Sequence, residues 1–310
     1  MMKKVSISTQ SKTVLADLQT PVSLYLKVRD VFPESALLES SDFHGNENSL
    51  SFIGLKPIAR FEVANGKVKT EYPDGSTDTK TVSSVADELN SFVHSFEVKS
   101  DQNTTGFNGF FGYTSYDAVK YFEDVDPQKS SASTVAIPDM VYIFYRYIIV
   151  INHFKNEMTI VENIVEGGES KMHELLAMLH NRNFASYNFA AKGAEESTVT
   201  DEEYKGMVRK GVQHCKRGDV FQLVLSRRFS QAFSGDDFKV YRALRSVNPS
   251  PYLFYFAFGS FRIFGSSPET HCCVGKGKAY IDPIAGTFKR TGDDEKDKQL
   301  AHDLLQDPKE

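Results

Sequence analysis

The segment IARFEVANGKVKTEYPDGS, residues Ile58–Ser76, decides the fold class of this chain. Apolar and polar residues alternate on both sides of Asn65-Gly66, which is the pattern of two half-buried β-strands. Asn-Gly is a strong two-residue hairpin signal because both residues tolerate the positive φ that a type I′ turn requires. The segment therefore predicts an antiparallel hairpin.

A second pair of strands is expected further along the chain. MVYIFYRYIIVINHF, residues Met140–Phe154, is rich in β-branched and aromatic residues and predicts a buried strand, and residues 156–165 predict its partner. Helices are expected at 21–28 after Thr20, at 85–96 after Ser84, and at about 169–180. Helices together with antiparallel strands predict an α+β fold.

The chain is expected to divide at a linker. Residues 182–199 lose periodicity and gain Ala, Gly and Ser, which predicts an N-terminal segment at 1–181, a linker at 182–199 and a second domain at 200–310. At the start of the second domain, Thr200 and Glu203 predict a capping box for a helix that ends at Gly218. The next residues, 219–229, alternate and predict a strand with one polar face.

Charge and composition argue against several classes of function. The 310 residues carry a formal net charge of −5 and no clustered basic stretch, which argues against nucleic acid as a partner. No apolar run approaches the length of a membrane span, and the N-terminus lacks the apolar core of a signal peptide. We therefore expect a cytoplasmic protein without a membrane partner. Three cysteines, two of them adjacent, do not suit a disulfide framework.

Residues near the C-terminus suggest a site for a small anion. Glu269 follows a proline at a predicted strand end, where a carboxylate is either held for proton transfer or simply solvated in a turn. The loop PIAGT offers the backbone N–H groups of Gly286 and Thr287, backed by Lys289 and Arg290, although an ordinary loop explains the same residues. No spacing typical of zinc, nucleotide or dinucleotide binding is present.

Four motifs carry a resemblance to a known family. GDVFQLVLSRRF (218–229), NPSPYLFYF (248–256), FGSSPE (264–269) and DPIAGT (282–287) resemble, in order and spacing, the chorismate-utilising enzymes, among them anthranilate synthase component I. ALLES and GFFGYTSYDAVKYFE (109–123) are similar to the N-terminal segment of that subunit. The resemblance implies mostly antiparallel sheets that form a β-sandwich-like core flanked by helices. It also implies a regulatory segment at 1–181 and a chorismate-binding catalytic domain at 200–310.

The resemblance implies a reaction and roles for five residues. Relatives that add water carry a lysine at the position of Gln222, and many aminodeoxychorismate synthases carry one at the position of Ala285, so ammonia is the expected nucleophile here. Glu269 matches the general acid that protonates the departing ring hydroxyl, and Gly286 and Thr287 match substrate-binding positions. The expected reaction converts chorismate and ammonia to anthranilate and pyruvate, which makes the enzyme a carbon–oxygen lyase of tryptophan biosynthesis.

The resemblance also implies regulation by tryptophan. The matching positions, which would bind the inhibitor where the two segments meet, are Glu39, Ser40, Pro251, Tyr252 and Leu253.

The resemblance implies a cofactor and a partner. The glutamates that would bind Mg²⁺ are expected downstream of Glu310, so no metal ligand is expected within 1–310 and the 310-residue chain alone is expected to be inactive. A glutamine amidotransferase subunit is expected to supply ammonia. Two alternatives stay open: aminodeoxychorismate synthase component I, and a regulatory module that binds tryptophan without catalysis.

Overall fold

The computed structural model describes residues 3–40, 49–100, 104, 106–125, 137–282, 284 and 288–306. The chain divides into two compact units. The larger unit contains residues 1–184 and 244–310, and the smaller unit contains residues 185–243. The predicted boundaries at 181 and 200 differ from these units. The reason is that residues 253–258 pair with residues 34–39 in one sheet.

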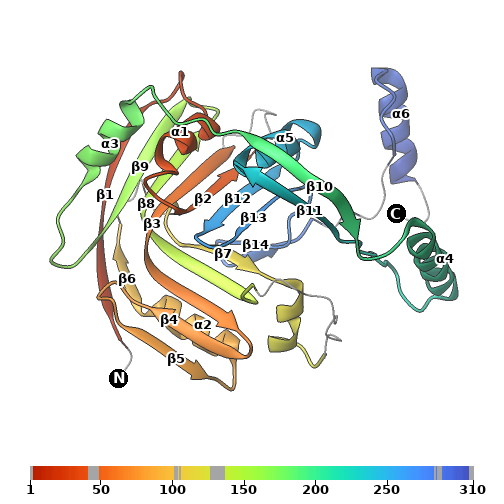
Figure 1. Ribbon diagram of the computed structural model, residues 1–310, viewed down its shortest axis with the longest axis horizontal. Coiled ribbons are helices and arrows are strands. Elements are labelled where there is room, and N and C mark those ends of the chain that lie inside the picture. The colour runs from red at the N-terminus through yellow and green to blue at the C-terminus, as the bar shows by residue number, and fades with distance from the viewer. Residues whose placement is uncertain are drawn as a thin grey trace. The chain divides into compact units, whose positions relative to one another are not determined.

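A single large sheet forms the core of the larger unit (Figure 1). Among the described residues it contains eleven strands in the order β13-β12-β2-β3-β8-β9-β1-β6, with β4 and β7 paired to β3 and β8, and β5 paired to β4. Its strands are β1 (Val5–Leu15), β2 (Glu34–Glu39), β3 (Leu50–Ala64), β4 (Lys67–Glu71), β5 (Thr77–Thr81), β6 (Phe96–Lys99), β7 (Phe110–Thr114), β8 (Met140–Asn152), β9 (Glu157–Val165), β12 (Tyr252–Phe258) and β13 (Arg262–Ser267). Its pairs are antiparallel except β1 with β6.

The hairpin predicted around Asn65-Gly66 is confirmed. Strands β3 and β4 are antiparallel and are joined at Asn65 and Gly66, whose φ angles are 52° and 73°. These positive angles are those of a type I′ turn, which explains the Asn-Gly sequence.

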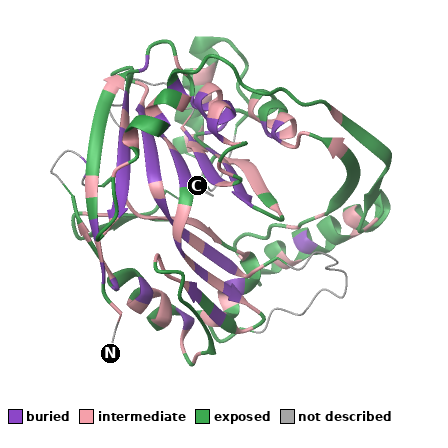
Figure 2. Cartoon of the chain, turned by 60° about the vertical axis from the view of Figure 1, so that its left-hand side comes forward, coloured by how far each residue is buried: buried purple, intermediate pink, exposed green. Residues whose placement is uncertain are grey.

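Strand β8 divides the core into two layers because successive side chains point to opposite faces of the sheet. Phe144 packs into one cluster with Phe61 and Phe92, whereas Ile143 and Tyr145 pack into another with Val161 and Phe256. Figure 2 shows the buried residues gathered in the strands of the large sheet.

Helices begin where the sequence predicts caps. Thr20 and Ser84 cap α1 (Pro21–Val28) and α2 (Val85–His94). In α1, Thr20 and Ser23 exchange capping hydrogen bonds, and Pro21 occupies the first turn, where a missing N–H is tolerated. The other helices are α3 (Met172–His180), α4 (Asp201–Arg217), α5 (Phe238–Val247) and α6 (Asp294–Leu305), and a 3₁₀ helix spans Tyr116–Tyr121.

The smaller unit contains the predicted helix but not the predicted strand. Helix α4 has the Thr200–Glu203 capping box and ends at Gly218, which has a φ of 81°. Residues 220–228 form no strand; the strand β11 (Phe229–Gly235) begins only where the prediction ends, and it pairs with β10 (Phe189–Ser197). An alternating segment forms a strand only where a neighbouring strand provides backbone hydrogen-bond partners. None of the described strands pairs with residues 220–228.

The predicted linker also contains structure, since β10 lies within 182–199. Its nine residues are almost all exposed. A strand with no buried face needs no alternation of apolar and polar residues, so the sequence carried no strand pattern. A short hairpin of β14 (Cys273–Gly275) and β15 (Lys278–Tyr280) completes the described strands. The predicted α+β fold with mostly antiparallel strands is confirmed.

Candidate functional site

A cavity of about 860 Å³ opens in the larger unit beside the paired strands β2 and β12. We call it the β2–β12 pocket. It is lined by Leu38, Glu39, Ser40, Ser49, Leu50, Phe52, Phe110, Phe111, Gly112, Tyr113, Tyr142, Pro251, Tyr252, Leu253, Phe254, Phe256 and Ile263. All five residues expected at a tryptophan site therefore line one cavity.

Strand pairing explains how residues so distant in sequence meet. Strand β12 lies antiparallel to β2, and Leu253 stands opposite Glu39 in the register. Glu39 ends β2 and is only 5% exposed, and Ser40 follows it directly. The five residues are thus positioned by one pair of strands.

The buried carboxylate of Glu39 has a cationic partner that sequence analysis missed. The Nε atom of Arg245, near the end of α5, lies 3.2 Å from Oε2 of Glu39. A buried carboxylate needs such a partner, because leaving it uncompensated in a low-dielectric interior costs several kcal/mol. No local pattern around Arg245 marked it, since its partner Glu39 lies far from it in the sequence.

A hydrogen-bonded group supports the backbone at Ser40. The Ser40 N–H donates to the Ser51 hydroxyl at 3.3 Å, and that hydroxyl lies 2.7 Å from Nε2 of His153. Burial, together with the nearby positive charge of Arg245, lowers the pKa of His153. His153 is therefore neutral at pH 7, so it adds no second positive charge beside Arg245.

Strand β7 closes the aromatic wall of the pocket. Phe110, Phe111 and Tyr113 come from this strand, and the Tyr113 hydroxyl donates to the Pro138 carbonyl at 2.7 Å. Gly112 pairs with Tyr142 of β8, and a Cβ added at Gly112 would overlap the Val141 carbonyl oxygen. The motif GFFGY therefore combines three aromatic side chains with a glycine, Gly112, that the close strand approach requires.

The arrangement suits a small amphipathic ligand with a ring. Aromatic and aliphatic side chains form most of the wall, and Glu39 supplies a carboxylate that can accept hydrogen bonds from an ammonium group. Pockets of a few hundred Å³ with few polar groups are typical of small-molecule sites.

The structure describes only two of the five residues expected at the chorismate site. Glu269 is exposed, two residues beyond the end of β13, and its backbone N–H donates to the Ser267 hydroxyl at 3.3 Å. Gln222 is exposed in the smaller unit, within the irregular stretch before β11. Ala285, Gly286 and Thr287 lie outside the described residues.

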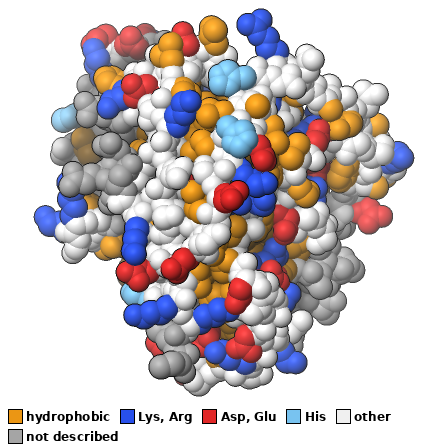
Figure 3. All heavy atoms as spheres, turned by 90° about the vertical axis from the view of Figure 1, so that its left-hand side faces the viewer, with side chains coloured by type: hydrophobic (Ala, Val, Ile, Leu, Met, Phe, Trp, Pro, Cys, Tyr) orange, Lys and Arg blue, Asp and Glu red, His pale blue; other side chains and the backbone are white. Residues whose placement is uncertain are grey.

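Charged groups elsewhere are dispersed. Within the described ranges no three His, Cys, Asp or Glu side chains come together as a metal site. The side of the larger unit drawn in Figure 3 carries acidic and basic side chains next to one another around apolar ones. No described helix has both the length and the apolar character needed to cross a membrane.

Comparison with known proteins gives a consistent result. The family described as chorismate binding enzyme matches residues 34–310. The chain is 31% identical to anthranilate synthase component 1 of Thermus thermophilus over 96% of this chain and 64% of that protein. It is 29% identical to the corresponding protein of Aquifex aeolicus over 96% of this chain and 62% of that protein. The chain thus spans less than two thirds of the length of these relatives.

Solved structures agree with the fold. Anthranilate synthase component I from Streptococcus pneumoniae superposes with a TM-score of 0.64 at 25% identity, over 96% of this chain and 64% of that chain. The menaquinone-specific isochorismate synthase of Escherichia coli superposes with a TM-score of 0.61 at 14% identity, over 98% and 60%, and supports the fold alone. With its family match, its sequence relatives and its fold in agreement, the chain belongs to the chorismate binding enzyme family.

Proposed function

We propose that this chain is part of an anthranilate synthase large subunit, which converts chorismate and ammonia to anthranilate and pyruvate in tryptophan biosynthesis and is inhibited by tryptophan. The observation that carries the regulatory part is the meeting of Glu39, Ser40 and residues 251–253 around one cavity. The catalytic part is supported by relatives named anthranilate synthase component 1 that align with 96% of this chain.

Three positions support amination as the reaction. Glu269 is exposed near a strand end, where it can protonate the hydroxyl that leaves the ring. Gln222 and Ala285 have side chains that cannot act as the base or the nucleophile of related enzymes, which leaves ammonia as the attacking group. The proposed substrate loop adds Gly286 and Thr287.

The proposal includes a metal and a partner. Mg²⁺ would supply charge neutralisation for the chorismate carboxylates, and its ligands are proposed to follow residue 310. Among the described residues, no three His, Cys, Asp or Glu side chains come together as a ligand set for this ion. A glutamine amidotransferase subunit in the cytoplasm is the proposed source of ammonia.

A second candidate is a regulatory module that binds tryptophan without catalysis. It is favoured by one observation, which is that the β2–β12 pocket lies entirely within the larger unit. Aminodeoxychorismate synthase component I is the remaining alternative, and its product differs from anthranilate.

Calorimetry with tryptophan tests the regulatory part. Ser40→Phe should weaken binding at least about tenfold, a change of about 1.4 kcal/mol, because the ring would fill the pocket. Ser83→Phe, at an exposed position before α2, is the matched control and should bind as the parent does. Equal affinity in parent and Ser40→Phe would place the tryptophan site elsewhere.

Product analysis tests the catalytic part. The chain is incubated with chorismate, Mg²⁺ and ammonium, alone and joined to the remaining C-terminal region of the Thermus thermophilus relative. We expect anthranilate from the joined protein and no measurable anthranilate from the 310 residues alone. Isochorismate or aminodeoxychorismate as the main product would refute the assignment, and a joined protein that binds tryptophan without turnover would favour the regulatory module.

A further inference from the structure

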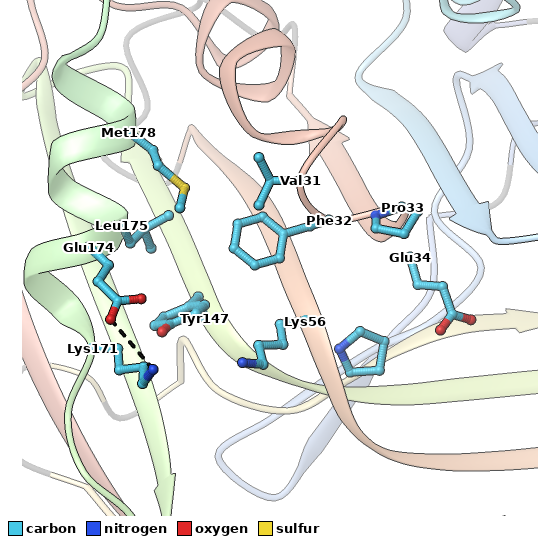
Figure 4. Close-up of a pocket in the computed structure, with 11 residues that line it drawn as sticks. Val31, Phe32, Pro33, Glu34, Lys56, Tyr147, Lys171, Glu174, Leu175 and Met178 are labelled. Atoms are coloured by element: carbon cyan, nitrogen blue, oxygen red, sulfur yellow. Dashed lines mark ion pairs between the residues drawn. The ribbon is translucent and has the colours of Figure 1, made fainter.

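A second cavity, of about 410 Å³, lies in the larger unit. Its walls come from the turn before β2, from β3 at Lys56, from β8 at Tyr147 and from helix α3 (Figure 4). We call it the Lys56 cavity. It shares no lining residue with the β2–β12 pocket, so a ligand can occupy it independently.

One part of the Lys56 cavity is apolar. Tyr147 and Leu175 are 3% and 1% exposed, and the rings of Phe32 and Tyr147 meet edge to face with centroids 6.2 Å apart. Met178 lies on the same side as Leu175 (Figure 4). A methionine adapts its shape to an apolar guest because its side chain is unbranched and polarizable. These four side chains form a surface suited to one ring or a branched alkyl group.

The charged side chains of the lining are two lysines and two glutamates. Lys171 is paired with Glu174 at 3.5 Å, and Glu34 is paired at 2.8 Å with Arg60, which also pairs with Glu62 at 3.0 Å. Lys56 makes no ion pair with any described residue, and Figure 4 shows its amine directed toward the side where Tyr147 and Lys171 lie. Lys56 is therefore the lysine of the lining whose amine is left for a ligand anion, next to the apolar side chains.

The backbone holds Lys56 in an uncommon conformation. Its φ is 61°, in the left-handed region that favours Gly or Asn, and Pro57 follows it although the residue before a proline prefers an extended backbone. The pairing of β3 with β8 shifts register between Pro57 and Ala59. A β-bulge of this kind changes the direction of a side chain, and backbone strain of this kind often marks functional sites.

We propose that the Lys56 cavity binds a small monocarboxylate with an apolar body, the carboxylate against the Lys56 amine and the body against Phe32, Tyr147, Leu175 and Met178. The cavity volume suits a molecule of one ring, since small-molecule sites begin at about 300 Å³. None of its lining residues belongs to the proposed tryptophan or chorismate site.

The test uses 3-phenylpropionate and its neutral amide, which has the same shape without the charge. Binding is measured by NMR from the labelled methyl groups of methionine, with the Met178 signal assigned through Met178→Leu. We expect the acid to shift the Met178 signal and to bind at least about tenfold more tightly than the amide. Lys56→Asn should abolish this preference, and Lys56→Arg should retain it.

Lys276→Asn is the matched control, because Lys276 is also an exposed lysine with positive φ (51°) but lies in the β14–β15 hairpin. It should bind the acid as the parent does. Lys56→Asn should remain folded by circular dichroism, because asparagine tolerates the left-handed region better than lysine. Equal binding of acid and amide to the parent, or an unchanged preference in Lys56→Asn, would overturn the proposal. The acid is added to about a few mM, roughly 20 times the protein concentration. A Met178 signal that does not move under these conditions would overturn the proposal as well.

Discussion

Glu162 shows how one buried carboxylate stabilises a helix. Its side chain is 0% exposed and accepts hydrogen bonds from the Arg146 guanidinium at 2.8 Å, the Ser170 hydroxyl at 2.7 Å and the Lys171 N–H at 2.9 Å. Burial alone would raise the pKa of Glu162, but these hydrogen bonds and the charge of Arg146 hold it below its ordinary value. The carboxylate thus fixes the start of α3 against β9.

Replacing this charge tests its contribution. Glu162→Gln should lower the free energy of unfolding by about 3 to 5 kcal/mol, because it leaves the partly buried Arg146 without its counter-charge. Urea denaturation at pH 7 measures the change. Glu174→Gln removes a half-exposed partner of Lys171 and should cost less than about 1 kcal/mol. Equal losses in the two variants would contradict this account.

Lowering the pH should remove the stability that the Glu162 carboxylate contributes. A carboxylate whose pKa is lower in the folded chain stabilises the fold above its unfolded pKa, and this stability is lost as the pH falls through the folded pKa. The parent should therefore lose stability more steeply than Glu162→Gln below about pH 4. Denaturation curves at pH 3 to 6 compare the two slopes, and parallel slopes would show that Glu162 is not responsible.

His153 gives the corresponding prediction near neutral pH. Burial and Arg245 lower its pKa, so the folded protein keeps it neutral and gains stability above the unfolded pKa of about 6.5. This stability should decline as the pH falls through the lowered pKa. An NMR titration should find the pKa of His153 below that of a free histidine, and Arg245→Met should raise it. A titration unchanged in Arg245→Met would remove the charge of Arg245 as a cause.

Residue-level sequence reasoning identified part of the site. The resemblance named Glu39 and Leu253, and the register that places them opposite each other is a tertiary fact that no local pattern contains. Arg245 was missed because its role comes from its contact with Glu39, 206 positions earlier in the chain.

At the scale of elements, local chemistry predicts what local interactions determine. Three helix caps and one turn were predictable, because each is stabilised within a few residues. They are the caps at Thr20, Ser84 and Thr200 and the turn at Asn65. The stretch 219–229 was misjudged, since a strand also needs a neighbour. The parallel pairing of β1 with β6 was not predictable either, because it joins segments about ninety residues apart.

Strand β7 yields a prediction at this scale. Gly112→Ala should destabilise the larger unit by about 3 kcal/mol or more, because the added Cβ would overlap the Val141 carbonyl and push β7 from β8. Gly109→Ala is the control, since a Cβ there would meet nothing within 4 Å. Thermal unfolding of both variants measures the difference. A Gly112→Ala protein as stable as Gly109→Ala would show that β7 relaxes without cost.

At the scale of the whole molecule, the β2–β12 pocket joins distant parts of the chain. Its walls come from residues 38–40, 49–52, 110–113, 142, 251–256 and 263, so the pocket forms only when strands from distant parts of the chain pair in the large sheet. A ligand that binds this pocket therefore stabilises the folded larger unit against unfolding. The smaller unit forms its own pairing of β10 with β11 and provides no wall.

Hydrogen exchange can separate the two units. At 100 times its dissociation constant, tryptophan should stabilise the larger unit by about 2.7 kcal/mol, which slows exchange of amides that open only by unfolding about 100-fold. Amides of β2 and β12 should show this protection, and those of β10 and β11 should show less if the smaller unit opens separately. Ser40→Phe should abolish the protection. Exchange in β2 and β12 that tryptophan leaves unchanged would contradict the proposed site, whereas equal protection in β10 and β11 would show that both units unfold together.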